Sequence, residues 1–325
     1  MCDNIIPDEW INLVNLKTIK ITYSDQVKVK VYNELSIIYD LINLEELELN
    51  NVMVDINKLN KLVNLNSLNF INCNFSANKI ELDKLSKLTI NKCSMNNEMF
   101  YNFFDIEKLN LTSLNLQNNI FSKIPNISTQ LNLEVLKIES NPIYELPEYI
   151  GLLNKIHTLY VPGTFMKPFP KSIANLTELN KTNIFDMCFD LFYLYEDKIL
   201  ITNFDSYMLK NEFPNNITQM NILNCVNIDN FIKTSNNYDN LPNTIEKIKI
   251  HNLKSELLNL PHVLQELRLY NSLIKFNDIK LPYGCSLYVD DILILQDGSN
   301  YNQKIFLPPN NHLLPANDNI DGYEY

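Results

Sequence analysis

Large apolar residues recur along the chain with a fixed internal spacing. The segment LKTIKITYS, which starts at Leu16, has apolar side chains at its first, fourth and sixth positions, and LEELELNNV from Leu44 repeats this order. Within each segment apolar and polar side chains alternate, and a period of two predicts a short strand with one buried face and one face in water. Repetition of one short unit predicts a repeat array rather than a single globular core.

Eleven copies of this unit are present, with the pattern L-x-x-L-x-L-x-x-(N/C) and other large apolar residues allowed at the leucine positions. Consecutive copies start 19 to 28 residues apart, except for one interval of 38, and a degenerate twelfth copy lies near Cys285. The eleven copies start at Leu16, Leu44, Leu65, Leu85, Leu111, Leu133, Ile156, Leu179, Ile217, Ile245 and Leu264.

The segments between the strands must return along the other side of each unit and bury their own apolar residues. In three copies a proline stands nine residues before the next start, at Pro7, Pro147 and Pro170. The apolar spacing that follows these prolines suits a short helix or a 3-10 turn, which tolerates proline at its first position. One such unit cannot bury its apolar side alone, and stacked neighbours supply the missing partner.

These units resemble those of the leucine-rich repeat family, over roughly residues 6–295. The copies LPEYIGLL and FPKSIANLTEL resemble the intracellular type, whereas FPNNITQMNI, LPNTIEKIKI and LPHVLQELRL resemble FNIP-like repeats in the C-terminal half. The resemblance implies an α/β solenoid, a leucine-rich repeat horseshoe with a parallel concave β-sheet and short helices, 3-10 turns or loops on the convex side. It also implies binding of macromolecular partners as the usual work of such a chain.

The domain organisation that we predict is a solenoid of about 11–12 repeats over residues 1–295, followed by a C-terminal cap and polar tail over residues 296–325. The interval 187–213 interrupts the array. It contains either a worn repeat around Ile199 and Ile201, which we favour, or an aromatic-rich insertion that would form a contact element. The last position of each unit, which we call the ladder position, holds Asn119, Asn141, Cys73, Cys93 and Cys225 in five copies and Val52, Met187 and Leu253 in three others.

Composition and charge limit the possible functions. The net charge of −11 argues against a nucleic-acid binder that relies on neutralising phosphates. The chain is Asn-rich, with 52 asparagines, and asparagine suits turns. No leader peptide or membrane-spanning segment is evident, and the six cysteines are interpreted as reduced packing residues. We therefore expect a cytoplasmic rather than secreted protein, with the nucleus or the cytoplasm of a host cell as alternatives.

Enzymatic chemistry has little basis in the sequence. The four histidines do not pair with cysteines or carboxylates at a spacing typical of metal ligands or nucleophiles. Five glycines are too few for a phosphate-binding glycine loop. We therefore predict no catalytic residues, no metal site and no cofactor.

Candidate partner-binding residues lie at the outward positions of the later strands. Aromatic residues there stand beside basic ones in an otherwise acidic chain, and such a patch could receive an acidic or phosphorylated segment of another protein. The alternative is that the strands merely need soluble faces. The candidates are Tyr160, Lys181, Phe185, Lys247, Lys249, His251, Arg268 and Tyr270. Replacing Lys247, Lys249 and Arg268 together by Glu is expected to abolish capture of the partner without changing the melting temperature.

Three classes of function fit this pattern. We favour a non-catalytic protein–protein interaction scaffold, because the repeats occupy almost the whole chain. The alternatives are a substrate-recruiting subunit of a ubiquitin ligase and a regulator of a phosphatase or GTPase. The few residues before Leu16 cannot hold a linking domain, which argues against the ubiquitin ligase subunit.

Overall fold

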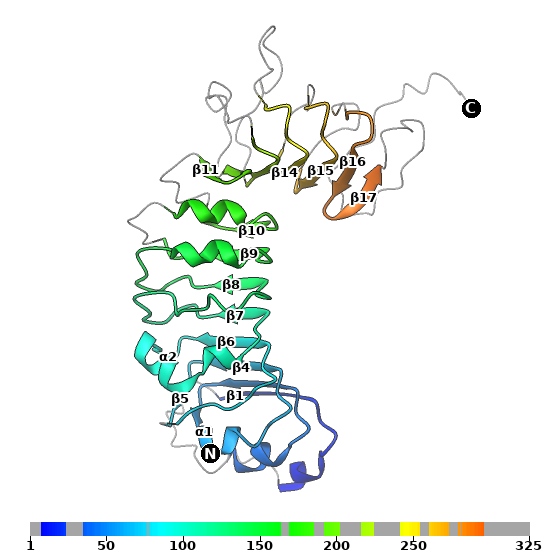
Figure 1. Ribbon diagram of the computed structural model, residues 1–325. Helices are drawn as coiled ribbons and strands as arrows, with labels where there is room; N and C mark the ends of the chain where they lie inside the picture. The colour runs from blue at the N-terminus through cyan, green and yellow to red at the C-terminus, as the bar shows by residue number, and fades with distance from the viewer. Residues whose placement is uncertain are drawn as a thin grey trace, which may run out of the picture. The chain divides into compact units, whose positions relative to one another are not determined.

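The computed structural model describes residues 8–23, 35–76, 78–163, 169–184, 192–201, 216–223, 241–253, 260–272, 279 and 281–295. Those residues form two compact units (Figure 1). Unit 1 consists of the described residues of Met1–Phe169 and Lys181–Met187, and unit 2 consists of those of Pro170–Asn180 and Cys188–Tyr325. The predictions made for Cys2, Phe185, Met187, Cys188, Cys225 and the tail 296–325 lie outside the described residues.

Unit 1 contains an eight-stranded sheet in which every neighbouring pair of strands is parallel. The sheet follows chain order, so each repeat adds one strand beside the previous one (Figure 1). Its strands are β1 (Thr18–Thr22), β2 (Glu46–Asn50), β4 (Ser67–Ile71), β6 (Lys87–Asn91), β7 (Ser113–Asn115), β8 (Val135–Lys137), β9 (Thr158–Tyr160) and β10 (Lys181–Thr182).

The leucines of the repeat set the register of this sheet. Leu47 aligns with Leu68 and Leu68 with Leu88, and the same row continues through Leu114. These side chains are at most 2% exposed. A one-residue slip of any strand would turn its apolar side chains to water, so burial fixes the alignment. The predicted α/β leucine-rich repeat fold is confirmed, with parallel strands on one side of each coil and short helices, 3-10 turns or loops on the other.

The return segments of unit 1 are short helical pieces with few turns each. The sequence pattern places proline at the first position of these pieces, whereas Pro147 lies one position before the first residue of η4. Asp55 and Asn96 cap α1 and α2 by accepting hydrogen bonds from backbone N–H groups of the first turn. The pieces are η1 (Asp8–Asn12), η2 (Ser36–Asp40), α1 (Ile56–Leu59), α2 (Asn97–Phe103), η3 (Ile106–Lys108) and η4 (Glu148–Leu152), with a small parallel pair of β3 (Met53–Val54) and β5 (Asn74–Phe75).

Asparagines hold the left-handed backbone positions that follow several strands. Asn51, Asn72 and Asn118 have φ values of 62°, 50° and 56°. Asparagine tolerates this region better than other residues with a Cβ, because its side chain can bond locally. The Asn72 amide also donates a hydrogen bond of 2.5 Å to Asn51 Oδ1 on the preceding coil. The asparagine content therefore has a structural use in the turns.

In four consecutive coils of unit 1 the ladder position forms a buried column of polar contacts. Asn119 Oδ1 accepts hydrogen bonds from the backbone N–H groups of Cys93 and Met95 at 3.0 and 3.1 Å. One coil earlier, Cys93 Sγ accepts from the backbone N–H of Cys73 at 3.3 Å. Asn141 repeats the role of Asn119 one coil later, where its Oδ1 accepts from a backbone N–H at 3.1 Å. Small polar side chains at this position thus satisfy backbone groups that would otherwise be buried without partners.

Unit 2 contains a seven-stranded sheet whose inner strands are parallel and whose outermost strands at both ends are antiparallel. Ile199 and Ile201, where the sequence suggests a worn repeat, lie in β12 and align with Met220 and Ile222 of β13. That residues 1–295 form one continuous solenoid stays a prediction. The elements are η5 (Lys171–Asn175), β11 (Phe192–Tyr195), β12 (Lys198–Ile201), β13 (Gln219–Ile222), β14 (Lys247–His251), β15 (Glu266–Tyr270), β16 (Ser286–Val289) and β17 (Ile292–Leu295).

Candidate functional site

The candidate site lies on the side of the unit 2 sheet that faces away from its apolar core. Alternate residues of each parallel strand point into that core, as Ile248 and Leu267 do, and the residues between them point outward. We call the outward residues of these strands the unit 2 strand face. They are Lys198, Leu200, Gln219, Asn221, Lys247, Lys249, His251, Glu266, Arg268, Tyr270, Ser286 and Tyr288.

Five of the eight residues predicted from the sequence meet on the unit 2 strand face. Lys249 aligns with Arg268, His251 aligns with Tyr270, and Lys247 starts β14. Two others belong to unit 1, where Tyr160 ends β9 and Lys181 starts β10, and Phe185 lies outside the described residues. A partner-binding role for all eight stays a prediction.

The middle of the unit 2 strand face is covered rather than open to water. Asn221, Lys249 and His251 are 5%, 8% and 5% exposed, although all three point away from the apolar core. Residues 177–179 of the same unit contact this region. The Asn221 amide donates a hydrogen bond of 3.1 Å to the carbonyl oxygen of Leu179, and Lys249 Nζ lies 2.8 Å from Glu178 Oε2. Two of the predicted surface residues, Lys249 and His251, are therefore buried.

The charges on this face are partly neutralised by nearby carboxylates. Arg268 Nε lies 2.7 Å from Glu266, and its Nη1 lies 3.0 Å from Asp291. The hydrogen bond that Arg268 donates to Glu266 raises the pKa of Arg268 above its usual value, and the guanidinium also lies 4.3 Å from the centre of the Tyr288 ring. Lys247 is exposed, and none of the ion pairs found among the described residues includes it. This lysine is thus the basic side chain most open to a partner.

His251 stacks on Tyr270 at the edge of the face, with ring centres 4.6 Å apart and planes 13° apart. Burial, together with the charge of Lys249, lowers the pKa of His251 to about 4. Burial and the hydrogen bond that Tyr270 donates to Asp291 at 2.6 Å raise the pKa of Tyr270. At neutral pH both rings are uncharged, so His251 contributes packing rather than positive charge.

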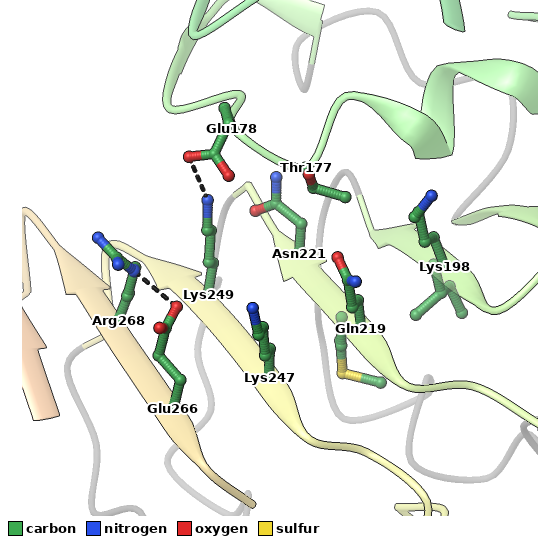
Figure 2. A pocket seen from close by; sticks show the side chains of 11 residues that line it. Thr177, Glu178, Lys198, Gln219, Asn221, Lys247, Lys249, Glu266 and Arg268 are labelled. Carbon is green, nitrogen blue, oxygen red and sulfur yellow. Dashed lines mark hydrogen bonds and ion pairs between the residues drawn. The ribbon is translucent and has the colours of Figure 1, made fainter. Parts of the chain in front are cut away.

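A pocket of about 140 Å³ opens on this face, and all of its lining residues belong to unit 2. Figure 2 shows the head groups of Lys249 and Asn221 beside Glu178, with Lys247 on the same strand as Lys249 and Lys198 on β12. The lining residues are Thr177, Glu178, Lys198, Ile199, Gln219, Met220, Asn221, Lys247, Lys249, Glu266 and Arg268.

Sequence reasoning missed part of this pocket. Lys198 and Asn221 occupy outward strand positions. The repeat pattern could have identified Asn221 from the copy that starts at Ile217, and Lys198 once the worn repeat was aligned. Glu178 carries no such signal, because it lies 71 residues before Lys249 in the chain and outside any strand. Its part in the site follows only from the fold.

The chemistry available in the pocket is ionic binding. Four cationic side chains and two carboxylates line it, which gives a local charge of 4 − 2 = +2. Within the described part of the chain, no group of three or more His, Cys, Asp or Glu side chains could hold a metal ion. None of the helices in that part is long and apolar enough to cross a membrane.

Comparisons with known proteins concern the fold. No family model matches the sequence, and no curated protein matches it. Among solved structures, a leucine-rich repeat protein of Leptospira interrogans is 20% identical over 87% of this chain and 74% of that chain, with a TM-score of 0.42. An internalin of Listeria monocytogenes is 17% identical over 87% of this chain and 84% of its own, with a TM-score of 0.37. The Arabidopsis receptor kinase HAESA, in complex with the peptide hormone IDA and the co-receptor SERK1, is 16% identical over 84% of this chain and 47% of its own, with a TM-score of 0.40.

Proposed function

We propose that this chain is a non-catalytic scaffold that binds another protein through the unit 2 strand face. Outward side chains of consecutive strands lie about 4.8 Å apart, so the five parallel strands that carry this face present a surface about 19 Å across. That span suits a polypeptide segment, whereas a metabolite is usually enclosed in a single pocket of about 300–1,000 Å³.

The observation that carries this proposal is the sign of the charge on the face. The chain as a whole has a net charge of −11, yet the pocket on the unit 2 strand face has a local charge of 4 − 2 = +2. An acidic or phosphorylated segment would be attracted to this region and repelled by most of the remaining surface. The partner that we propose is therefore a protein with such a segment.

The experiment compares partner capture by the full chain with capture by the Lys247→Glu variant, using chemical crosslinking and mass spectrometry in cells of the source organism. Reversal of this exposed charge is expected to weaken capture about tenfold, equivalent to about 1.4 kcal/mol. Lys87→Glu is the matched control, because Lys87 is also an exposed first residue of a strand, but in unit 1. Equal capture by all three proteins would contradict the proposed face.

The triple replacement of Lys247, Lys249 and Arg268 by Glu is a poorer test than the sequence suggests. Lys249 is 8% exposed and pairs with Glu178, so a glutamate there would bury one carboxylate beside another. We expect the melting temperature of the triple variant to fall, contrary to the sequence-based expectation. Lys247→Glu alone avoids this effect.

We also propose a cytoplasmic location and, for the proline-containing copies, intracellular-type repeats. The described cysteines Cys73, Cys93 and Cys285 are unpaired and buried, which fits a reducing compartment. A hydrogen bond with Cys73 and burial raise the pKa of Cys93, which favours its protonated, unreactive form. Imaging of the tagged full chain in source cells tests the location. The FNIP-like assignment of the later copies rests on the sequence pattern.

A further inference from the structure

An ion pair in the pocket lining joins one buried and one exposed side chain. The Lys249 side chain is 10% exposed, whereas the Glu178 side chain is 57% exposed. A buried ammonium needs a partner, because its charge has lost most of its hydration. An exposed carboxylate can instead turn into water with little loss. Lys249 is therefore a fixed cation, and Glu178 is a replaceable anion.

A second feature of the pocket is a buried hydrogen-bond acceptor without a partner. Asn221 Oδ1 is buried and accepts no hydrogen bond, while the amide nitrogen of the same side chain donates to the Leu179 carbonyl oxygen. That donated bond fixes the orientation of the amide. Buried polar atoms normally have partners, so an unpaired acceptor on a residue that lines the pocket indicates where a ligand could donate a hydrogen bond.

We infer that this pocket binds one Asp or Glu side chain of an extended acidic segment, and that Glu178 occupies the seat of that carboxylate when no partner is bound. The partner's carboxylate displaces Glu178 from Lys249, and a backbone N–H of the same segment donates to Asn221 Oδ1. The inference rests on the proposed function and adds its ligand class and an internal competitor. By occupying this position, Glu178 lowers the affinity of the pocket for the partner's carboxylate.

The size and charge of the pocket favour a carboxylate. A volume of about 140 Å³ is smaller than the roughly 300–1,000 Å³ of pockets that enclose small molecules, and it suits a single side chain. The pocket already holds a carboxylate against Lys249 (Figure 2). Because the pocket is small and already fits the planar carboxylate of Glu178, a bulkier tetrahedral phosphate is expected to fit less well.

The test measures binding of a trifluoroacetylated peptide, Thr-Val-Glu-Val-Thr, to the full chain by fluorine NMR relaxation, which detects weak complexes. The key variant is Glu178→Gln, which removes the competing charge at an exposed position. Because no carboxylate of the chain then occupies the position beside Lys249, the affinity for the peptide is expected to rise about five- to tenfold. The matched control is Glu266→Gln, which changes the pocket charge by the same amount but leaves Lys249 paired, and we expect a gain of at most about twofold.

Two further peptides test the ligand class. A peptide with Gln in place of Glu is expected not to bind, and a peptide with phosphoserine at that position is expected to bind more weakly than the Glu peptide. Equal gains from Glu178→Gln and Glu266→Gln would overturn the displacement of Glu178, because general electrostatics would then explain both. Tighter binding of the phosphoserine peptide would overturn the choice of a carboxylate.

The outcomes also separate this inference from the proposed function. If no peptide binds even the Glu178→Gln variant while partner capture still depends on Lys247, the pocket inference fails and the scaffold proposal stands. If capture is independent of Lys247 while the Glu peptide binds as expected, the pocket is an anion site but the proposed partner surface is wrong.

Discussion

Replacing the ladder residue Asn119 by leucine tests how the coils of unit 1 are held together. Asn119 is 6% exposed, and leucine has nearly the same shape. The exchange leaves the backbone N–H groups of Cys93 and Met95 without acceptors, and also removes the donor to three carbonyl groups. A buried donor left without a partner costs about 1–3 kcal/mol. Two such donors lower the free energy of unfolding by about 2–6 kcal/mol. The carbonyl groups that lose a donor add less to this loss, because each has a second lone pair.

We therefore expect Asn119→Leu to lower the free energy of unfolding of unit 1 by about 4 kcal/mol. Asn119→Cys should cost less, because Cys93 already shows that a thiol accepts the equivalent backbone bond one coil earlier. The matched control is Asn132→Ala, which loses two exposed hydrogen bonds of 2.9 and 2.6 Å and should stay within about 0.5 kcal/mol of the parent.

The assay is urea unfolding of the full chain, followed by the fluorescence of Trp10, which lies in the described part of unit 1. Trp10 is the single tryptophan of the chain, so the signal reports unit 1 alone. A loss below about 1 kcal/mol for Asn119→Leu would refute the ladder as a main source of stability.

Two other predictions concern unit 2 and the turns. Because burial lowers the pKa of His251 from 6.5 to about 4, the unfolded chain binds its proton first as pH falls, so stability should decrease between about pH 6.5 and 4. Between pH 7 and pH 5 the free energy of unfolding of the parent should fall by about 2 kcal/mol more than that of His251→Phe. The measurement is urea unfolding at each pH, followed by the circular dichroism of the sheet. Equal falls in the two proteins would contradict a neutral His251. Asn72 has a φ of 50° at a left-handed turn, so Asn72→Val should lower the free energy of unfolding by about 1–3 kcal/mol and Asn72→Gly by much less. Urea unfolding followed by Trp10 fluorescence measures both. Equal losses would contradict backbone strain as the cause of the destabilisation.

The repeat pattern predicts the strands and the core well, because both depend on spacing within about 25 residues. Leu47, Leu114 and Ile248 are all buried where the apolar period places them, and Asn119 and Asn141, both at the ladder position, accept hydrogen bonds from backbone N–H groups of the preceding coil. Such features repeat from coil to coil, so every copy reinforces the same prediction.

The candidate site depends instead on contacts that do not repeat. The alternation of β14 correctly places Lys249 and His251 outside the apolar core, but alternation carries no information about what covers them. Glu178 reaches Lys249 across 71 positions of sequence, and the antiparallel strands at the ends of the unit 2 sheet also break the repeat pattern. Pairings of this kind follow from the folded chain rather than from its period.

The measurement that tests the account most directly is selection of random peptides displayed on phage against the purified full chain. If the unit 2 strand face binds an acidic segment, the selected peptides will be rich in Asp and Glu and will lose binding to the Lys247→Glu variant but not to Lys87→Glu. Neutral or basic peptides, or acidic peptides that bind the Lys247→Glu variant as well as the parent, would contradict the account.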